Sequence, residues 1–174
     1  TITSGAAMQE VAEASITNNS GAANDTVVPT TSTRFYNFFT LPTTGKLYVI
    51  TGIEWKNGTV VAGLVVCAIQ QVDANPPTNA IVILSALGQT VTATGTSSVQ
   101  RVSVISTNVF RGGALIAVFI QGANATQRFM TATVGSSNIR KNVASTASVE
   151  NADGSAWVAY TEQAYCKIYY REYK

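Results

Sequence analysis

The fold of this 174-residue chain is decided by residues 46–71, which read KLYVITGIEWKNGTVVAGLVVCAIQQ. Residues 46–56 are rich in the β-branched, aliphatic and aromatic residues that strands favour. Residues 59–71 form a nearly continuous apolar run, which is typical of a strand buried on both faces. Between them, Asn57-Gly58 is a strong signal for a tight turn. We therefore predict two strands joined by a β-hairpin.

The same texture continues on both sides of this stretch. Turn signals recur about every ten residues, and helical periodicity is nearly absent after Glu13. This pattern predicts an all-β fold, an antiparallel β-sandwich, with a jelly roll as the preferred arrangement and an immunoglobulin-type sandwich as the alternative. The expected strands are residues 34–40, 46–56, 59–71, 80–87, 99–105, 114–120, 128–134, 157–161 and 165–173.

Residues 1–33 differ from the rest of the chain. They are rich in Ala, Thr, Ser and Asn and contain no aromatic residue. We expect an N-terminal extended arm here, or a short helix over residues 4–13, followed by a single β-sandwich domain over residues 34–174. Two interpretations of the arm stay open: a terminus without fixed structure, and a segment that reaches a neighbouring subunit.

The composition is poor in charge. Only 11% of the residues are charged, against about 25% in an average soluble domain. The net charge of +2 gives no field strong enough to indicate nucleic acid or an anionic membrane as a partner. A surface with few charges can pack against copies of itself without desolvating many ionised groups. The longest apolar run, Val60 to Ile69, is about half the length that a membrane-spanning helix needs.

The chain contains no histidine, which removes a Ser-His-Asp triad, a Cys-His pair and the commonest metal ligand. We expect no enzyme, no cofactor and no metal. A pair of carboxylates that cleaves glycosides stays as a minor alternative, with these candidates: Glu54, Asp73, Glu150, Asp153, Glu162 and Glu172. For Cys67 and Cys166, buried free thiols and a disulfide both stay open.

Aromatic residues gather in two places. One cluster comprises Phe35, Tyr36, Phe38 and Phe39, and the other comprises Tyr165, Tyr169, Tyr170 and Tyr173. Alternation along a strand would send the side chains of the first cluster to two faces. One face would then meet the core and the other a neighbouring subunit, so the first cluster is a candidate assembly surface. The alternative is an ordinary sandwich core with exposed tyrosines.

A second candidate site is the pair Glu54 and Trp55. A sugar ring could stack on Trp55 while Glu54 accepts a hydrogen bond from a hydroxyl, which would make this pair a glycan contact. The alternative places Trp55 in the core and Glu54 on the exposed face or in a salt bridge. The second interpretation is the one we favour.

One part of the chain resembles a known group of modules. Residues 99–120 run from a strand through STNVF and RGGA into another strand. This is similar to the glycine-marked entry to a late strand in jelly-roll modules of bacteriophage capsid decoration, head-fibre and tail-fibre proteins. The resemblance covers roughly residues 46–130 and carries over no functional residue. It implies a structural role on the virion surface, often as a trimer and sometimes with a glycan-binding tip.

We therefore expect a non-enzymatic virion structural protein, part of the extracellular particle, that serves as a capsid decoration, head-fibre or tail component. Its expected partners are copies of itself, with a trimer favoured, other virion proteins and a host-surface glycan. Neither nucleic acid nor a membrane is expected as a partner. A carbohydrate-binding module or lectin with a β-sandwich fold is the alternative.

Overall fold

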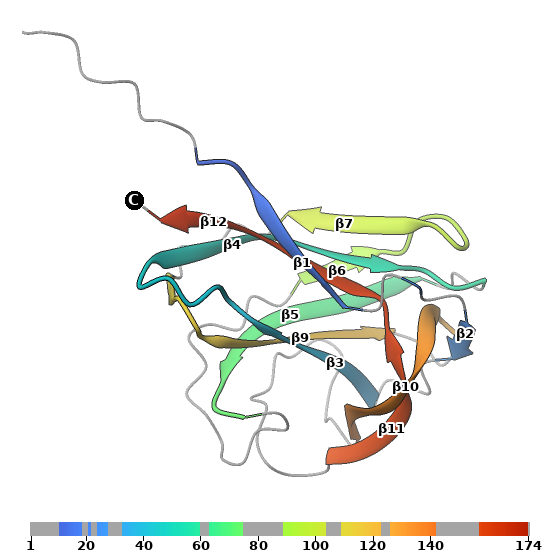
Figure 1. The fold of residues 1–174 in the computed structure, drawn as a ribbon. Helices are drawn as coiled ribbons and strands as arrows, with labels where there is room; N and C mark the ends of the chain where they lie inside the picture. The colour runs from blue at the N-terminus through green and yellow to red at the C-terminus, as the bar shows by residue number, and fades with distance from the viewer. Residues whose placement is uncertain are drawn as a thin grey trace, which may run out of the picture.

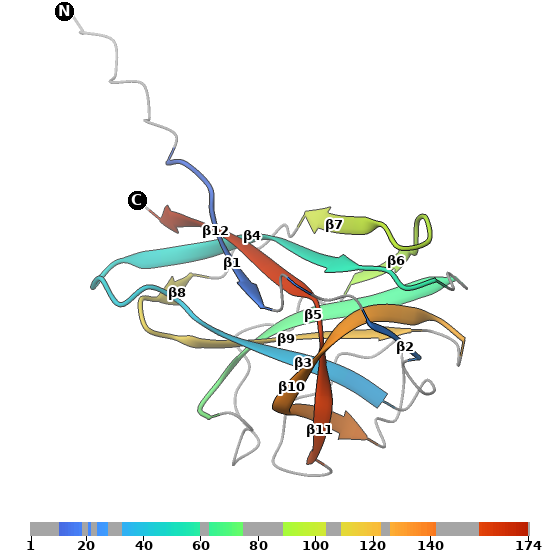
Figure 2. The same cartoon turned by 45° about the vertical axis from the view of Figure 1, so that its right-hand side comes forward.

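Two antiparallel sheets lie face to face in the computed structural model (Figures 1 and 2). No helix occurs in the part of the chain that the structure describes. That part accordingly contains no helix that could span a membrane. The predicted all-β sandwich is confirmed, whereas the jelly-roll subtype stays a prediction. The structure describes residues 11–18, 21, 24–27, 33–59, 63–74, 89–103, 109–122, 126–141 and 157–173.

We call the five-stranded sheet, which is the upper layer in Figure 1, sheet A. Its strand order is β1-β12-β4-β7, and the two-residue strand β8 also pairs with β4. All of its ladders are antiparallel. The strands of sheet A are β1 (Ala14–Asn18), β4 (Leu47–Lys56), β7 (Val99–Ser103), β8 (Phe110–Arg111) and β12 (Cys166–Tyr173).

The seven-stranded sheet, which we call sheet B, has the order β11-β10-β3-β9-β5-β6, and β2 pairs with β10. Its strands are β2 (Asn24–Val27), β3 (Thr33–Thr40), β5 (Leu64–Val72), β6 (Gln89–Thr92), β9 (Leu115–Gly122), β10 (Arg128–Lys141) and β11 (Trp157–Ala164). The strand expected at residues 80–87 lies outside the described residues.

The predicted hairpin at Asn57-Gly58 is wrong, although both of its strands exist. β4 belongs to sheet A and β5 to sheet B, so the connection between them crosses from one sheet to the other. The backbone N–H of Asn57 bonds to the carbonyl of Ser98, and that of Gly58 bonds to the carbonyl of Arg128. Both carbonyls belong to segments far along the chain. Their hydrogen bonds fix the connection that passes from one sheet to the other, whereas a hairpin would have placed the next strand beside β4.

The main core lies between the two sheets. Strands of both sheets supply its buried side chains at alternate positions, as a sandwich requires. Its largest members are Trp55, Phe35, Phe39, Phe110, Phe129, Tyr48, Leu41, Ile50, Ile53 and Ile69.

The outer face of sheet B is buried as well at its central strands. A second apolar cluster joins side chains of its three central strands, β3, β9 and β5. This confirms that the strand in residues 59–71 is buried on both faces, which its uninterrupted apolar run predicted. The buried members of this outer cluster are Tyr36, Val66, Ala68, Val72, Ala117 and Phe119.

The N-terminal arm needs a correction. Residues 14–18 are strand β1, which extends sheet A along β12, and residues 24–27 are strand β2, which pairs with β10. Without β1, the edge of β12 would leave its N–H and C=O groups unpaired; the pairing satisfies them and also places Ile16 against the core. Residues 11–13 are not helical, and the remainder of the helix expected at residues 4–13 lies outside the described residues.

Candidate functional site

Burial removes most of the first aromatic cluster from the list of accessible surfaces. Phe35 and Phe39 lie in the core between the sheets, and Tyr36 lies in the outer cluster of sheet B. Only Phe38 keeps partial exposure. The assembly surface expected at these four residues is therefore wrong for three of them, because the central strands of sheet B are buried on both faces. Alternation did send the side chains to two faces, as expected.

Trp55 is fully buried and cannot stack on a sugar. Its indole Nε1 donates a hydrogen bond to Oδ1 of Asn57 at 2.9 Å. Glu54 points to the opposite side of β4, onto the outer face of sheet A. The alternative interpretation of this pair is therefore the one that the structure supports.

Asn57 uses every polar atom of its side chain inside the molecule. Besides accepting from Trp55, its amide nitrogen donates to the carbonyl of Thr94 at 2.8 Å and to Oε1 of Gln100 at 3.1 Å. Gln100 in turn donates to the carbonyl of Thr92. This buried network ties the crossing after β4 to the turn before β7. Sequence reasoning assigned Asn57 to a turn and missed this structural role.

Glu54 is the centre of a polar cluster on the outer face of sheet A. Its two carboxylate oxygens accept hydrogen bonds from the hydroxyl groups of Tyr165 and Tyr169, each at 2.5 Å. Lys167 forms an ion pair with it at 3.4 Å. The register of β12 on β4 explains the grouping, because Lys167 lies directly opposite Glu54 and Tyr169 lies one pair further along the same face.

The electrostatics of this carboxyl follow from its neighbours. Burial raises the pKa of Glu54, but the hydrogen bonds from Tyr165 and Tyr169 and the charge of Lys167 favour the ionised form more strongly. The net effect is a lowered pKa for Glu54. Burial, followed by the hydrogen bond to Glu54, raises the pKa of Tyr165 to about 12. At neutral pH the carboxylate is therefore ionised and the phenol is protonated.

Arg101 of β7 extends this cluster toward the N-terminal segment. Its guanidinium lies 3.7 Å from the centroid of the Tyr169 ring and donates to both carboxylate oxygens of Glu13, at 2.8 and 2.9 Å. Thr51 donates a further hydrogen bond to Glu13. We call the group Glu13, Thr51, Glu54, Arg101, Lys167 and Tyr169 the latch, because it joins the segment before β1 to β4, β7 and β12.

Gly52 makes room for the latch. A Cβ atom at this position would lie 2.9 Å from Nε of Arg101 and 3.3 Å from the carbonyl oxygen of Val102. The register of β4 on β12 shifts beside it, so that Gly52 pairs with Tyr169 and Ile50 pairs with Tyr170. The Arg101 side chain can therefore cross β4 and reach the ring of Tyr169.

The latch leaves little chemistry free for a ligand. Both oxygens of Glu54 already accept hydrogen bonds, and the guanidinium of Arg101 covers one face of Tyr169. Two of the carboxylates that the sequence analysis gave as glycosidase candidates, Glu150 and Asp153, lie outside the described residues. Among the residues that the structure does describe, no three Cys, Asp or Glu side chains gather as metal ligands. Because its polar groups already bond to one another, the role of the latch is to hold strands of sheet A together.

A row of exposed side chains lies further along the same face of sheet A. Tyr173 pairs with Leu47, and Leu47 pairs with Arg111, so the three side chains line up across β12, β4 and β8. Tyr173 is 52% exposed and Leu47 is 40% exposed. The aromatic cluster at residues 165–173 was visible in the sequence, but only the register brings Tyr173 beside Leu47 and Arg111.

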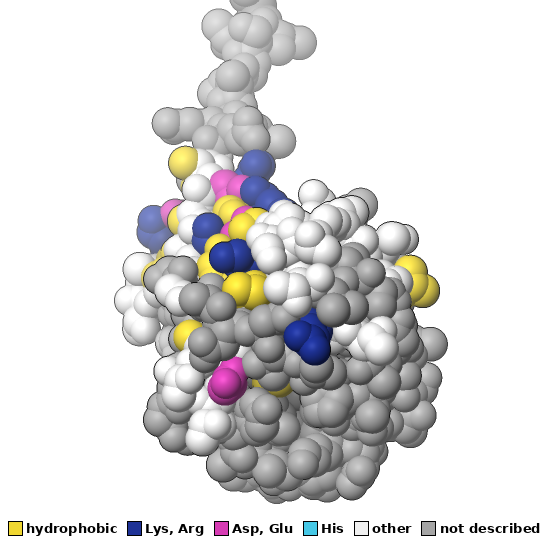
Figure 3. Space-filling view, turned by 90° about the vertical axis from the view of Figure 1, so that its right-hand side faces the viewer, with side chains coloured by type: hydrophobic (Ala, Val, Ile, Leu, Met, Phe, Trp, Pro, Cys, Tyr) yellow, Lys and Arg dark blue, Asp and Glu magenta, His cyan; other side chains and the backbone are white. Residues whose placement is uncertain are grey.

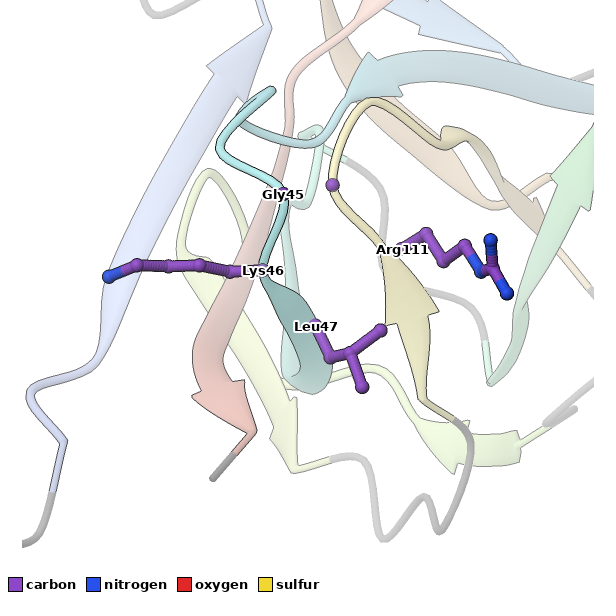
Figure 4. Close-up of a pocket in the computed structure, with 5 residues that line it drawn as sticks. Gly45, Lys46, Leu47 and Arg111 are labelled. Carbon is purple, nitrogen blue, oxygen red and sulfur yellow. The ribbon is translucent and has the colours of Figure 1, made fainter.

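A cavity of about 410 Å³ adjoins this row, between the turn that precedes β4 and the end of β8 (Figure 4). Its lining residues are Gly45, Lys46, Leu47, Arg111 and Gly112. In Figure 4 the side chains of Leu47 and Arg111 lie on one side of the strand pair, whereas Lys46 points the other way. We call the row together with this cavity the row pocket.

Comparison of the sequence with protein-family models gives no match, and comparison with curated proteins gives none either.

Proposed function

We propose that this chain is a non-enzymatic structural protein of a virus particle and that it acts by assembling with copies of itself and with other particle proteins. The observation that carries the proposal is the composition of the outer face of sheet A. Of the four large apolar side chains that are well exposed in the described part of the chain, Leu47, Val99 and Tyr173 lie on this face.

The polar part of this face supports the same role. Protein interfaces are enriched in tyrosine and arginine and depleted of lysine and acidic residues at their centre. Here the ionised groups of the latch form two ion pairs, Arg101 with Glu13 and Lys167 with Glu54. A partner that covers the latch therefore meets charges that already have counter-charges. Figure 3 shows hydrophobic, basic and acidic side chains side by side in the upper part of that view.

The test is the native mass of the chain, measured by light scattering at several concentrations. We expect a concentration-independent oligomer, with a trimer as the favoured state. Leu47→Ser should shift the oligomer toward monomer, because it removes an exposed apolar group from the face. Leu64→Ser is the matched control, since Leu64 is 44% exposed but belongs to sheet B. Equal effects of the two variants would contradict the choice of face.

A carbohydrate-binding role is the second candidate, and the exposed ring of Tyr173 is the observation that favours it. Sugars stack on open aromatic rings, and Tyr173 offers such a ring whereas Trp55 does not. A glycan screen with the Tyr173→Ala variant as control tests this role. Binding that survives the substitution would remove Tyr173 from the site.

A further inference from the structure

We propose that the row pocket is the docking site for an acidic segment of a partner protein, in which a carboxylate side chain lies two residues from an apolar one. The inference deepens the assembly role and rests on it. It assigns to this site a chemistry that the exposed apolar groups alone would not specify.

The shape of the pocket comes from two glycine-containing turns. Gly45 has a φ of +69°, a conformation that other residues rarely adopt, and a Cβ there would meet nothing within 4 Å. A Cβ on Gly112 would lie 2.6 Å from the carbonyl oxygen of Pro42, so the two turns can approach only because Gly112 lacks a side chain. The backbone N–H of Gly112 also bonds to the carbonyl of Lys46 at 2.8 Å. These contacts define the walls of the pocket before any partner arrives.

The charge of the pocket is unbalanced. Lys46 has a counter-charge, because its ammonium lies 2.6 Å from the carboxylate of Glu172. Arg111 is exposed, and its guanidinium has no hydrogen bond or ion pair with any residue that the structure describes. Among the described residues, the pocket therefore presents one positive charge without a counter-charge, beside the apolar side chain of Leu47.

This imbalance restricts the occupant. A partner that buries Leu47 and Tyr173 also covers Arg111, because the three side chains form one row. Removing a guanidinium from water is strongly unfavourable unless a carboxylate replaces the lost solvation. A carboxylate can accept two parallel hydrogen bonds from the guanidinium. A neutral apolar partner would therefore pay the desolvation cost of Arg111 without this compensation.

The spacing of the row sets the order of residues in the partner. Neighbouring strands lie about 4.8 Å apart, and residues i and i+2 of an extended chain point to the same side about 6.6 Å apart. An extended segment that crosses the strands can thus place a carboxylate at Arg111 and an apolar side chain over Leu47 and Tyr173. The expected pattern is an acidic residue, any residue and an apolar residue.

The test is an NMR titration of the full ¹⁵N-labelled chain with the capped tripeptide Asp-Ser-Phe. We expect shifts at the backbone amides of Gly45 and Gly112 and at Nε–H of Arg111. The peptides Asn-Ser-Phe and Asp-Ser-Ser should bind at least about tenfold more weakly, which corresponds to 1.4 kcal/mol. Binding should also weaken as salt is raised, because it includes an exposed ion pair.

Two variants make the test specific. Arg111→Gln should abolish the preference for Asp-Ser-Phe over Asn-Ser-Phe. Lys56→Gln should keep it, because Lys56 lies on the same face of β4 but away from the pocket. An unchanged preference in Arg111→Gln, or no shift up to about 10 mM peptide, would overturn the proposal. Benzoate that binds as tightly as the peptide would also overturn it and would assign the pocket to small carboxylates.

The outcome is separable from the assembly proposal. Suppose that the Arg111→Gln variant forms the same oligomer as the unchanged chain but loses the preference for Asp-Ser-Phe over Asn-Ser-Phe. The pocket assignment is then supported, and its occupant is a partner other than a second copy of the chain. If the chain assembles but the peptide never binds, the pocket proposal fails while the assembly role stands. If the chain stays monomeric and also docks on no particle, the assembly role fails whatever the peptide does.

Discussion

Gly52 and Arg101 are neighbours across β4 and β7, and the missing side chain of Gly52 provides the space in which the Arg101 guanidinium crosses to Tyr169. The same guanidinium holds Glu13. One glycine thus makes possible the contact between the N-terminal segment and the opposite edge of sheet A.

Replacing this glycine tests the latch directly. Gly52→Ala places a Cβ 2.9 Å from Nε of Arg101, so the side chain must move and its contacts with Glu13 and Tyr169 weaken. We expect a loss of about 1–2 kcal/mol in the free energy of unfolding, measured by urea denaturation. Gly21→Ala is the control, because a Cβ there meets nothing within 4 Å. Equal stability of the two variants would show that the path of the Arg101 side chain over β4 does not depend on the space at Gly52.

The buried network at Asn57 should be sensitive to loss of its side chain. Asn57→Ala leaves the indole N–H of Trp55 without its acceptor and removes the donor to the carbonyl of Thr94 and to Oε1 of Gln100. We expect the free energy of unfolding to fall by about 2–3 kcal/mol. Tryptophan fluorescence during denaturant unfolding would measure this change. Thr96→Ala, at an exposed position of the adjoining turn, should change stability by less than about 0.5 kcal/mol.

Acid should weaken the latch. The hydrogen bond from Thr51 and the nearby Arg101 outweigh burial and lower the pKa of Glu13, and the pKa of Glu54 is lowered as well. Both folded-state pKa values lie below the ordinary value of 4.5, so the unfolded chain binds more protons in that range. The contribution of these groups is fully present above pH 4.5 and is lost as the pH falls through the lowered values. Thermal melts from pH 6 to pH 2 should show this loss, and Glu13→Gln with Glu54→Gln should flatten the dependence.

The two cysteines should be unreactive in the folded protein. Both are buried in the core and are not joined by a disulfide, and burial, followed by the charge of Cys67, raises the pKa of Cys166. Because the thiolate is the reactive form, we expect no modification by a thiol reagent such as DTNB until the chain unfolds. In urea both thiols should react at the rate of a small-molecule thiol. Rapid labelling under native conditions would contradict their placement in the core.

Substitutions in the first aromatic cluster should affect folding according to burial. Phe39→Ala removes a buried ring from the core and should cost about 3–5 kcal/mol. Phe38→Ala should cost less, because Phe38 is only partly buried. If the order of the two were reversed in denaturant titrations, the assignment of faces along β3 would be wrong. Phe38→Ala also serves as the folded variant in which a role of this strand in assembly can be examined.

Several features of the fold followed from local sequence. The apolar run of residues 59–71 predicted a strand buried on both faces, and β5 has both faces buried. The strand expected at residues 99–105 is present as β7, and Val99, Arg101 and Ser103 are exposed on one side of it. These predictions hold because a strand repeats every two residues, so burial on each face is written directly into the order of residues.

Other features depended on partners far away in the sequence. Asn57-Gly58 has the residues of a tight hairpin turn, yet their N–H groups donate to the carbonyls of Ser98 and Arg128 and hold the chain in a crossing between sheets. Glu13 and Arg101 are 88 residues apart and meet only because β1 and β7 both belong to sheet A. The pairing of Tyr173 with Leu47 is likewise a matter of register.

By itself, then, the sequence determined that this protein is an all-β sandwich with little charge and no histidine, because composition and period-two patterning are local properties of the chain. Only the tertiary structure decided that the first aromatic cluster is mostly buried, that Glu54 belongs to the latch, and that Arg111, Leu47 and Tyr173 form one row. The reason is physical: alternation fixes which face a side chain takes, whereas the neighbour strand and the register fix what it meets there.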